Sequence, residues 1–231
     1  KSWEIPEAGR RSKGRPLVNL IESIQKEEKI AAVLRIKSFE DAGCILLATK
    51  KGVVKKTSLD AYSNPRKNGV NAINIDDEDE VISAHYVKEN EQIMLFTRNG
   101  MAVRFDESIV RTIGRVARGV RGVLLKGPED KVVACCVVSG TETILVVCEN
   151  GYGKRSKVDN FRQTNRGGVG VRSILTSTRN GYVVGALDVK DEAGVFMMSV
   201  SGQSLRIRMQ DVRVMSRSTQ GVRLVNLKTK D

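Results

Sequence analysis

The sequence predicts an all-β, propeller-like fold built from four-stranded blades of about 50 residues. Three observations favour it: a loop motif recurs along the chain, short runs rich in Val, Ile and Leu alternate with polar or glycine turns, and no stretch has a convincing helical period. A single blade cannot bury both of its faces. Neighbouring blades are therefore expected to stack into a ring that leaves few open strand edges.

Two glycine-containing markers repeat with one period. The first is a loop of the form Arg-x(2–4)-Gly, and its five copies lie near residues 11–18, 66–73, 115–123, 166–174 and 217–224, with closing glycines 50–55 residues apart. The second is a glycine turn between strand-like runs, at Gly52, Gly100, Gly151 and Gly202, with intervals of 48–51 residues. Two independent markers that share a period indicate internal duplication.

Each repeat contains four strand-sized runs. In one repeat they are residues 120–125, 132–138, 143–148 and 152–157, and in the next 171–175, 182–189, 195–200 and 204–209. Val, Ile and Leu dominate these runs, as is typical of strands. The Asn-Gly pairs at 99–100 and 150–151 predict tight type I′ hairpin turns, in which both central residues have positive φ.

Residues 1–231 are expected to form one domain of about four and a half repeats. The last repeat stops after the run 222–227, and residues 1–8 resemble the end of a repeat whose beginning is not in this sequence. Either the ring is completed by joining the two ends, or part of it lies outside this chain.

The charge balance points to a polyanionic partner. Lys and Arg number 39 against 27 Asp and Glu, a formal net charge of +12, which attracts phosphate backbones or anionic membranes. Aromatic residues make up only 4%, which argues against binding of single-stranded nucleic acid by base stacking.

The longest apolar run, 132–138, is too short to cross a bilayer, and no signal-peptide core is present. With four cysteines and no C-x-x-C pair, a cytoplasmic protein without a membrane partner is expected.

Basic residues fall in register with the repeat. One set follows each glycine hairpin, and Arg104, Arg155 and Arg206 each lie 15 residues before the next loop glycine. A second set lies in the inter-repeat loops. A ring with such positions would present a curved positive band for double-stranded DNA, with little base specificity. The candidate DNA-contacting residues are Arg11, Lys13, Arg15, Lys55, Lys56, Arg66, Lys67, Arg104, Arg115, Arg118, Arg121, Lys154, Arg155, Arg166, Arg172, Arg206, Arg208, Arg217 and Arg223. The alternative is that these charges only keep edge strands soluble.

No catalytic, metal or cofactor site is expected. The acidic run 76–80 occupies a turn between two strand runs, and His85 is the only histidine, which argues against a Ser-His-Asp or Cys-His site. The segment 151–155 lacks the glycine spacing of a P-loop, and 168–170 lacks the third glycine of a dinucleotide fingerprint.

The chain resembles the C-terminal domain of the A subunit of bacterial DNA gyrase. The resemblance runs over the whole chain and rests on Ile5-Pro6-Glu7-Ala8, Gly14-Arg15-Pro16-Leu17-Val18-Asn19-Leu20, Thr49–Thr57, Asn150-Gly151-Tyr152-Gly153-Lys154-Arg155 and Thr219-Gln220-Gly221-Val222. It implies a β-pinwheel, a disc whose blades exchange a strand and whose basic rim wraps duplex DNA with positive handedness. Strand passage by the whole enzyme, a type II topoisomerase, then introduces negative supercoils at the expense of ATP.

The resemblance also implies partners outside this chain. These are the N-terminal breakage-reunion domain of the same polypeptide and the gyrase B subunit, in an A2B2 holoenzyme of the bacterial cytoplasm; ATP and Mg²⁺ belong to those other parts. The family's gyrase box is expected upstream of this sequence. The segment most similar to it is residues 163–170, which has Val169 in place of the lysine. We interpret this segment as an ordinary inter-repeat loop in which Arg166 contacts phosphate.

Two alternative functions stay open at this point. One is the equivalent domain of topoisomerase IV, which binds DNA but wraps it little. The other is a protein-binding β-propeller, which would use its flat faces and loops rather than its rim.

Overall fold

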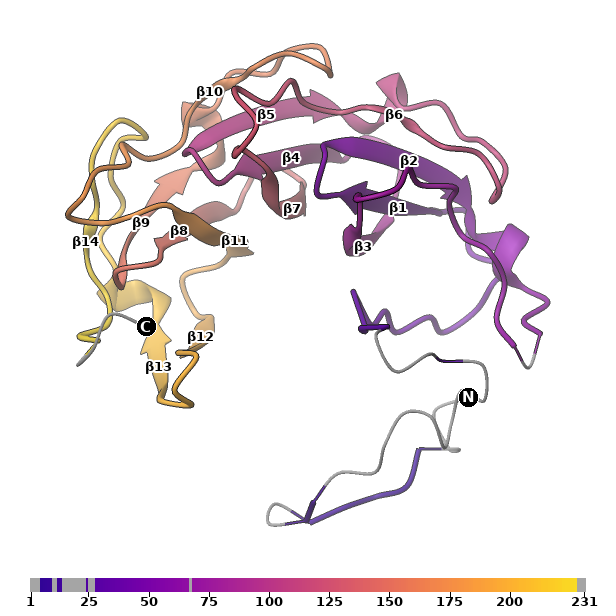
Figure 1. Cartoon of the computed structure of the whole chain (residues 1–231), viewed down its shortest axis with the longest axis horizontal. Coiled ribbons are helices and arrows are strands. Elements are labelled where there is room, and N and C mark those ends of the chain that lie inside the picture. The colour runs from indigo at the N-terminus through magenta and orange to yellow at the C-terminus, as the bar shows by residue number, and fades with distance from the viewer. Residues whose placement is uncertain (1–4, 10–11, 14–23, 25–27, 67, 228–231) are drawn as a thin grey trace.

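The computed structural model describes residues 5–9, 12–13, 24, 28–66 and 68–227. In this part of the chain, three four-stranded antiparallel sheets and one two-stranded sheet follow one another around an open arc (Figure 1). The prediction of an all-β fold of repeated four-stranded units is confirmed.

Each sheet is centred on a hairpin. The four hairpins are β1 (Cys44–Thr49) with β2 (Val53–Ser58), β4 (Gln92–Thr97) with β5 (Met101–Asp106), β8 (Thr143–Cys148) with β9 (Tyr152–Lys157), and β12 (Gly194–Met198) with β13 (Ser204–Arg208). A short 3-10 turn follows each hairpin: η3 (Leu59–Tyr62), η4 (Glu107–Ile109), η5 (Val158–Asn160) and η6 (Met209–Asp211).

An inner strand and an outer strand complete each of the first three sheets. The inner strands β3 (Val81–Val87), β7 (Val132–Val138) and β11 (Val183–Val189) pair with the first strand of the hairpin before them and pack against one another. The outer strands β6 (Val120–Arg121), β10 (Val171–Arg172) and β14 (Val222–Arg223) return from the following repeat to pair with β2, β5 and β9 on the convex side (Figure 1).

One sequence repeat therefore contributes to three sheets. The runs predicted at 132–138, 143–148 and 152–157 are strands with those bounds, whereas the run 120–125 is a strand only at Val120–Arg121. Among these four runs, β6 lies in the first sheet, β7 in the second, and β8 and β9 in the third. The exchange covers the outer edge of each of the three four-stranded sheets with backbone from a following repeat, which removes an open strand edge.

The glycine hairpins are not type I′ turns, so that prediction is wrong. In the second hairpin, three residues connect the strands, the amide of Gly100 donates to the carbonyl of Thr97 at 2.9 Å, and only the glycine has positive φ, at +82°. Three-residue hairpin loops typically have this form. The exchanged segment explains the glycine, since a Cβ there would lie 2.6 Å from the carbonyl oxygen of Ile174.

The hydrophobic core lies between successive sheets. Between the second and third sheets, Phe96 and Phe161 are fully buried and their rings meet edge to face, with centroids 6.1 Å apart. Phe196 in β12 occupies the repeat position of Leu145 and Met94, but it is 75% exposed where they are 1% and 0% exposed. Among the described residues no further sheet packs on this face of β12 and β13.

Candidate nucleic-acid interface

The basic residues that follow the first three hairpins are buried, so the prediction that they form an exposed band is wrong for Lys55, Lys56, Arg104, Lys154 and Arg155. Exposure is 0% for Lys55 and Lys154, 6% for Lys56 and 5% for Arg155. The Arg104 side chain is 11% exposed. These side chains point toward the following repeat and hold it in place.

The two arginines and Lys56 join successive repeats through polar contacts. Arg104 donates from Nη1 to the carbonyls of Val158 and Phe161, both at 2.9 Å, and from Nε to Gln92 Oε1 at 2.6 Å. Arg155 pairs with Asp191 at 2.6 Å, and Lys56 pairs with buried Glu107. A guanidinium with several donors satisfies buried carbonyls that would otherwise lack partners.

The corresponding arginine of the fourth hairpin, Arg206, is exposed and lies over the Phe196 ring, with 5.9 Å between the guanidinium carbon and the ring centroid. Arg208, at a different register position, is also exposed and donates to Asp211 at 2.9 Å. The difference arises because no described segment of a further repeat covers this hairpin.

Three rows of arginines follow the convex edge of the arc. We call them the rim arginines, and within each row the members are 51 residues apart: Arg111, Arg162 and Arg213; Arg115, Arg166 and Arg217; Arg121, Arg172 and Arg223. All nine are exposed or half-buried. Sequence reasoning missed the row that begins at Arg111, although its spacing of 51 residues was present as a signal.

Each rim loop crosses the edge of its sheet. In the first, Thr112 forms a parallel bridge with Lys56, and the amide of Ile113 donates to the Lys56 carbonyl at 2.9 Å. The chain then turns and comes back antiparallel to the start of β2 at Val120–Arg121. The contacts of Thr112 and Arg121 with β2 are therefore three residues apart along the strand, roughly 10 Å at about 3.3 Å per residue.

Neighbouring rim loops are hydrogen-bonded to each other. The amide of Leu124 donates to the carbonyl of Gly168 at 2.9 Å, and 51 residues later Leu175 donates to Thr219 at 3.1 Å. Arginine side chains also connect the same loops. Arg166 donates to the carbonyl of Arg121 at 3.1 Å, and Arg217 donates to the carbonyl of Arg172 at 3.3 Å. The loops thus form one continuous ribbon along the rim.

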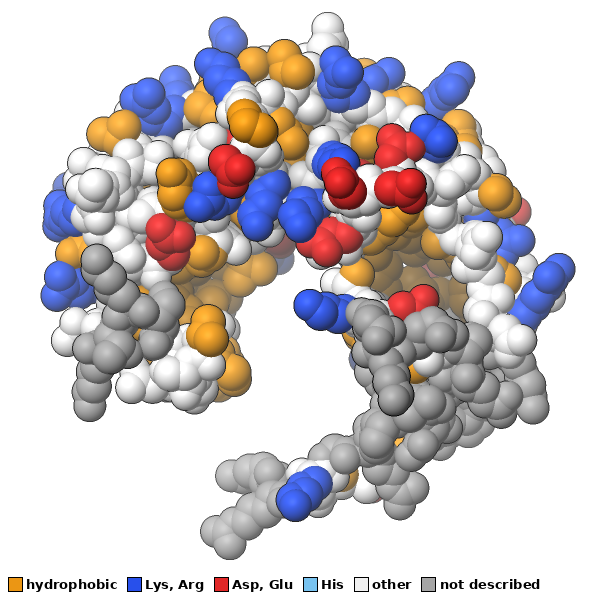
Figure 2. Space-filling model, in the orientation of Figure 1, with side chains coloured by type: hydrophobic (Ala, Val, Ile, Leu, Met, Phe, Trp, Pro, Cys, Tyr) orange, Lys and Arg blue, Asp and Glu red, His pale blue; other side chains and the backbone are white. Residues whose placement is uncertain are grey.

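The rim loops contain no acidic residue. Segments 111–121, 162–172 and 213–223 each have arginine at their first, fifth and last positions and neither Asp nor Glu. Figure 2 shows Lys and Arg side chains along the convex edge. Arg118 pairs with exposed Asp76 at 2.5 Å, and Arg223 donates to the Tyr152 hydroxyl at 2.8 Å. The ribbon is therefore a positively charged surface with fixed spacing.

The remaining predicted residues divide into two groups. Lys13 and Arg66 are exposed, whereas Arg11, Arg15 and Lys67 lie outside the described residues. Residues 163–170, the segment most similar to the gyrase box, lie in the second rim loop. There the amide of Thr164 donates to the Arg104 carbonyl at 2.8 Å. This is the position of an ordinary inter-repeat loop, as interpreted from the sequence.

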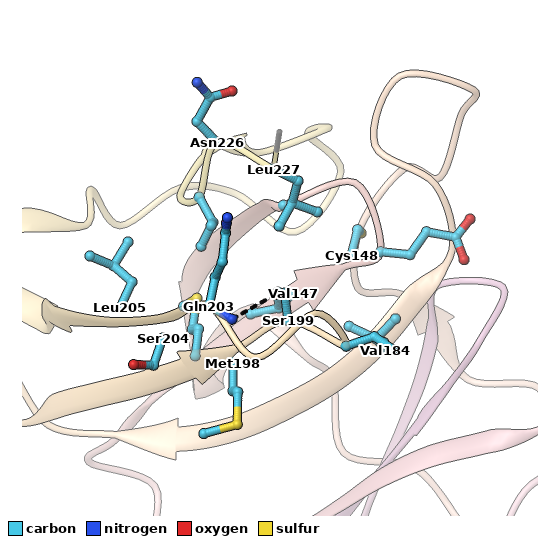
Figure 3. Close-up of a pocket in the computed structure, with 15 residues that line it drawn as sticks. Val147, Cys148, Val184, Met198, Ser199, Gln203, Ser204, Leu205, Asn226 and Leu227 are labelled. Carbon is cyan, nitrogen blue, oxygen red and sulfur yellow. Dashed lines mark hydrogen bonds between the residues drawn. The ribbon is translucent and has the colours of Figure 1, made fainter. Parts of the chain in front are cut away.

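A cavity of about 420 Å³ lies beside the fourth hairpin, between β8, the turn after β12 and the segment after β14 (Figure 3). Met198, Leu205 and Leu227 make its lining mainly apolar. Burial, with a smaller effect of Glu149, raises the pKa of the Cys148 thiol to about 12, so this thiol stays protonated. In its protonated form the thiol is not an effective nucleophile.

Neither a metal-binding cluster nor a membrane-spanning helix is present among the described residues. In these ranges no cluster of three or more His, Cys, Asp or Glu side chains has an arrangement that could hold a metal ion. No helix in the same ranges is both long and apolar enough to span a membrane.

Two solved structures share this architecture. A crystal structure of the C-terminal domain of DNA topoisomerase IV aligns with a TM-score of 0.85 and 29% identity, covering 92% of this chain and 66% of the other. A DNA gyrase A C-terminal domain aligns with a TM-score of 0.84 and 28% identity, covering 94% and 72%.

Sequence comparison agrees with the structural likeness. The chain is 59% identical over 232 residues to the A subunit of DNA gyrase from Chlamydia pneumoniae and 41% identical over 225 residues to that from Salmonella typhimurium. These alignments cover 100% and 97% of the chain but 28% and 25% of the relatives, so the chain spans about a quarter of their length. The family described as DNA gyrase C-terminal domain, beta-propeller, matches residues 1–37, 45–88, 91–139, 142–190 and 195–231. Because this match covers most of the sequence, the chain belongs to the DNA gyrase C-terminal domain family, as the resemblance implied.

Proposed function

We propose that the chain is a non-catalytic domain of the DNA gyrase A subunit that binds duplex DNA and bends it around the rim arginines. The observation that carries the proposal is the acid-free ribbon of hydrogen-bonded rim loops, with three arginine rows of constant spacing on a convex edge. Such a surface recognises the phosphate backbone and contributes little base information.

The physical requirements of wrapping match this ribbon. Duplex DNA carries one negative charge per about 1.7 Å of axis, so a convex row of cations meets phosphates along its whole length. Bending 20–30 bp by 40–90° costs about 1–6 kcal/mol, which phosphate contacts from several loops offset together. Because neighbouring loops are bonded to each other, their arginines keep their relative positions when DNA binds.

In the intact protein, the domain would act beside the DNA-cleaving part of the same polypeptide. We propose that it wraps DNA with positive handedness next to the breakage-reunion domain, within an A2B2 complex with the gyrase B subunit in the bacterial cytoplasm. Strand passage by that complex, with ATP and Mg²⁺ bound to its other parts, then produces negative supercoils.

A salt titration of duplex binding tests the rim assignment. Replacing Arg115, Arg166 and Arg217 together with Glu is expected to weaken binding to any duplex. The slope of log affinity against log salt should become shallower by roughly 2.7, because each lost phosphate contact removes about 0.9. Fluorescence anisotropy with a labelled duplex measures both quantities.

A control variant with the same change in net charge separates the effect of the rim arginines from that of the protein's overall charge. Lys88, Lys126 and Lys190 are exposed in turns outside the rim loops, and changing all three to Glu alters the net charge by the same amount. The control should keep most of the salt slope. Equal losses in the two variants would refute the rim assignment and favour a surface elsewhere, such as the flat faces that a protein-binding propeller uses.

The equivalent domain of topoisomerase IV is the second candidate function. The observation that favours it is the structural alignment with that enzyme's C-terminal domain. Its TM-score is 0.85, against 0.84 for the gyrase domain. The two functions differ in how much topological change the bound DNA acquires.

A further inference from the structure

We propose that Lys55 and Lys154 are positioning residues of the DNA interface and that the interface takes up protons at these two amines when duplex DNA binds. The proposal rests on the function proposed above. It adds a linkage between DNA binding and pH that the rim arginines cannot supply, because arginine does not titrate in the accessible range.

Both lysines lie directly beneath a rim loop. Lys55 and Lys154 are 0% exposed, on β2 and β9 respectively. Lys55 Nζ donates to the carbonyl of Arg115 and to that of Ala72. Lys154 Nζ donates to the carbonyl of Ser216 at 2.7 Å. Each amine therefore holds the main chain that carries a rim arginine, Arg115 in one loop and Arg217 in the other.

Neither amine has a carboxylate partner among the described residues, in contrast to neighbouring Lys56, which pairs with Glu107. The charged group that acts on Lys55 is Arg115 in the loop, and Arg115 acts on Tyr62 as well. The groups that act on Lys154 are Arg217 in the loop and Cys148 on β8. Burial, and secondarily the arginine above, lowers the pKa of each lysine to about 8.

The fold does not require a lysine at this position. Val103 occupies it in the second hairpin and Leu205 in the fourth, so the first and third hairpins have the charge and the other two have an apolar side chain. Burying an ammonium without a counter-ion destabilises the protein, whereas valine at the same place does not. A polyanion bound over the loop would stabilise the same ammonium.

Proton uptake follows from this arrangement. Without DNA, the amines lose protons near pH 8. Phosphates over the rim favour the protonated form and raise the pKa, so bound protein holds more protons than free protein and affinity falls as pH rises. If the pKa of each lysine rises by about one unit on binding, affinity falls about fivefold per lysine between pH 7 and pH 9.

Calorimetry on the unmodified 231-residue chain provides the first test. Binding of a duplex at pH 8 is measured in two buffers with different ionisation enthalpies, and the difference in heat reports the protons exchanged. A net uptake of about 0.8 proton is expected for a one-unit rise at both lysines. Uptake near zero, with affinity unchanged from pH 7 to pH 9, would overturn the proposal whatever happens to any variant.

Substitution assigns the uptake to residues. Lys55→Met with Lys154→Met should remove both the uptake and the pH dependence, while Lys88→Met with Lys190→Met, a matched loss of two exposed lysines, should leave them intact. A purely structural role of the buried lysines would lower affinity equally at pH 7 and pH 9, which would contradict the proposal. Duplex binding that depends on the rim arginines but not on pH would refute this inference alone; absence of duplex binding would refute the proposed function as well.

Discussion

The same repeat position can hold an arginine that joins two repeats or an arginine exposed to solvent. Arg104 and Arg206 occupy equivalent places, yet Arg104 bonds three buried or half-buried acceptors and Arg206 lies exposed over Phe196. Net charge and periodicity do not separate these cases. What separates them is whether the next repeat covers the side chain.

This difference leads to a prediction at the residue scale. Arg104→Met should lower the free energy of unfolding by about 2–4 kcal/mol, because the carbonyls of Val158 and Phe161 lose their donor inside the protein. Arg206→Met, its exposed counterpart, should change it by no more than about 0.5 kcal/mol. Urea unfolding followed by circular dichroism measures both, and similar shifts for the two variants would show that Arg104 does not join the repeats.

The strand exchange depends on one glycine in each of the first three hairpins and one in each of the three rim loops. Gly100 accepts two amides from the exchanged segment through its carbonyl, from Ser173 at 2.7 Å and Ile174 at 3.4 Å. Gly170 has φ of +78°, and a Cβ there would lie 2.0 Å from the carbonyl oxygen of Ala102. In these three sheets, both sequence markers are thus explained by one contact, in which the outer strand approaches the hairpin too closely for a side chain.

At the element scale, we predict that Gly170→Ala displaces β10 from β5. The expected destabilisation is at least about 3 kcal/mol, since strain at positive φ adds to a clash with backbone. Gly127→Ala is the matched control, because Gly127 also has positive φ, +90°, but a Cβ there meets nothing within 4 Å; about 1–2 kcal/mol is expected. Hydrogen exchange at the Ser173 amide should accelerate only in Gly170→Ala, and unchanged protection would contradict the close-approach explanation.

At the scale of the whole molecule, the curvature on which the proposed function rests arises only from the stacking of sheets. Each rim loop alone carries three arginines of the repeating rows, which suffices for weak electrostatic attraction. Side by side on the convex edge, the three loops hold nine, and their path is curved (Figures 1 and 2). The proposed wrapping would therefore depend on the arc rather than on any one repeat.

This gives a prediction at the scale of the molecule. When nicked circular DNA is sealed by ligase in the presence of the chain, the linking number should rise, with positive sign. Arg115→Glu, Arg166→Glu and Arg217→Glu together should remove most of that change, because fewer contacts remain to offset a bending cost of about 1–6 kcal/mol per 20–30 bp. The Lys88, Lys126 and Lys190 control should retain it. Binding by the unmodified chain without any change of linking number would favour a topoisomerase IV type of domain.

Much of the fold was predictable because its determinants are local. Alternation of Val, Ile and Leu predicts strands wherever they pair, and the bounds of β7, β8 and β9 agree with those expected. The pairing of Val120–Arg121 with β2, 66 to 68 residues earlier in the chain, was not predictable from composition or spacing. The Asn-Gly turns were misassigned because the glycine conformation serves the exchanged segment as well as the hairpin.

Sequence by itself determined the period, the strand content, the family and the presence of basic residues in register with the repeat. Only the tertiary structure decided which of those residues lie on the exposed rim. Arg104 and Arg155 are as periodic and as basic as Arg121 and Arg172, but the following repeat covers the first two, whereas the exchanged strands carry the other two exposed. The physical reason is that periodicity in sequence reports the repeat position of a side chain, whereas its exposure depends on the neighbouring repeat that packs against it.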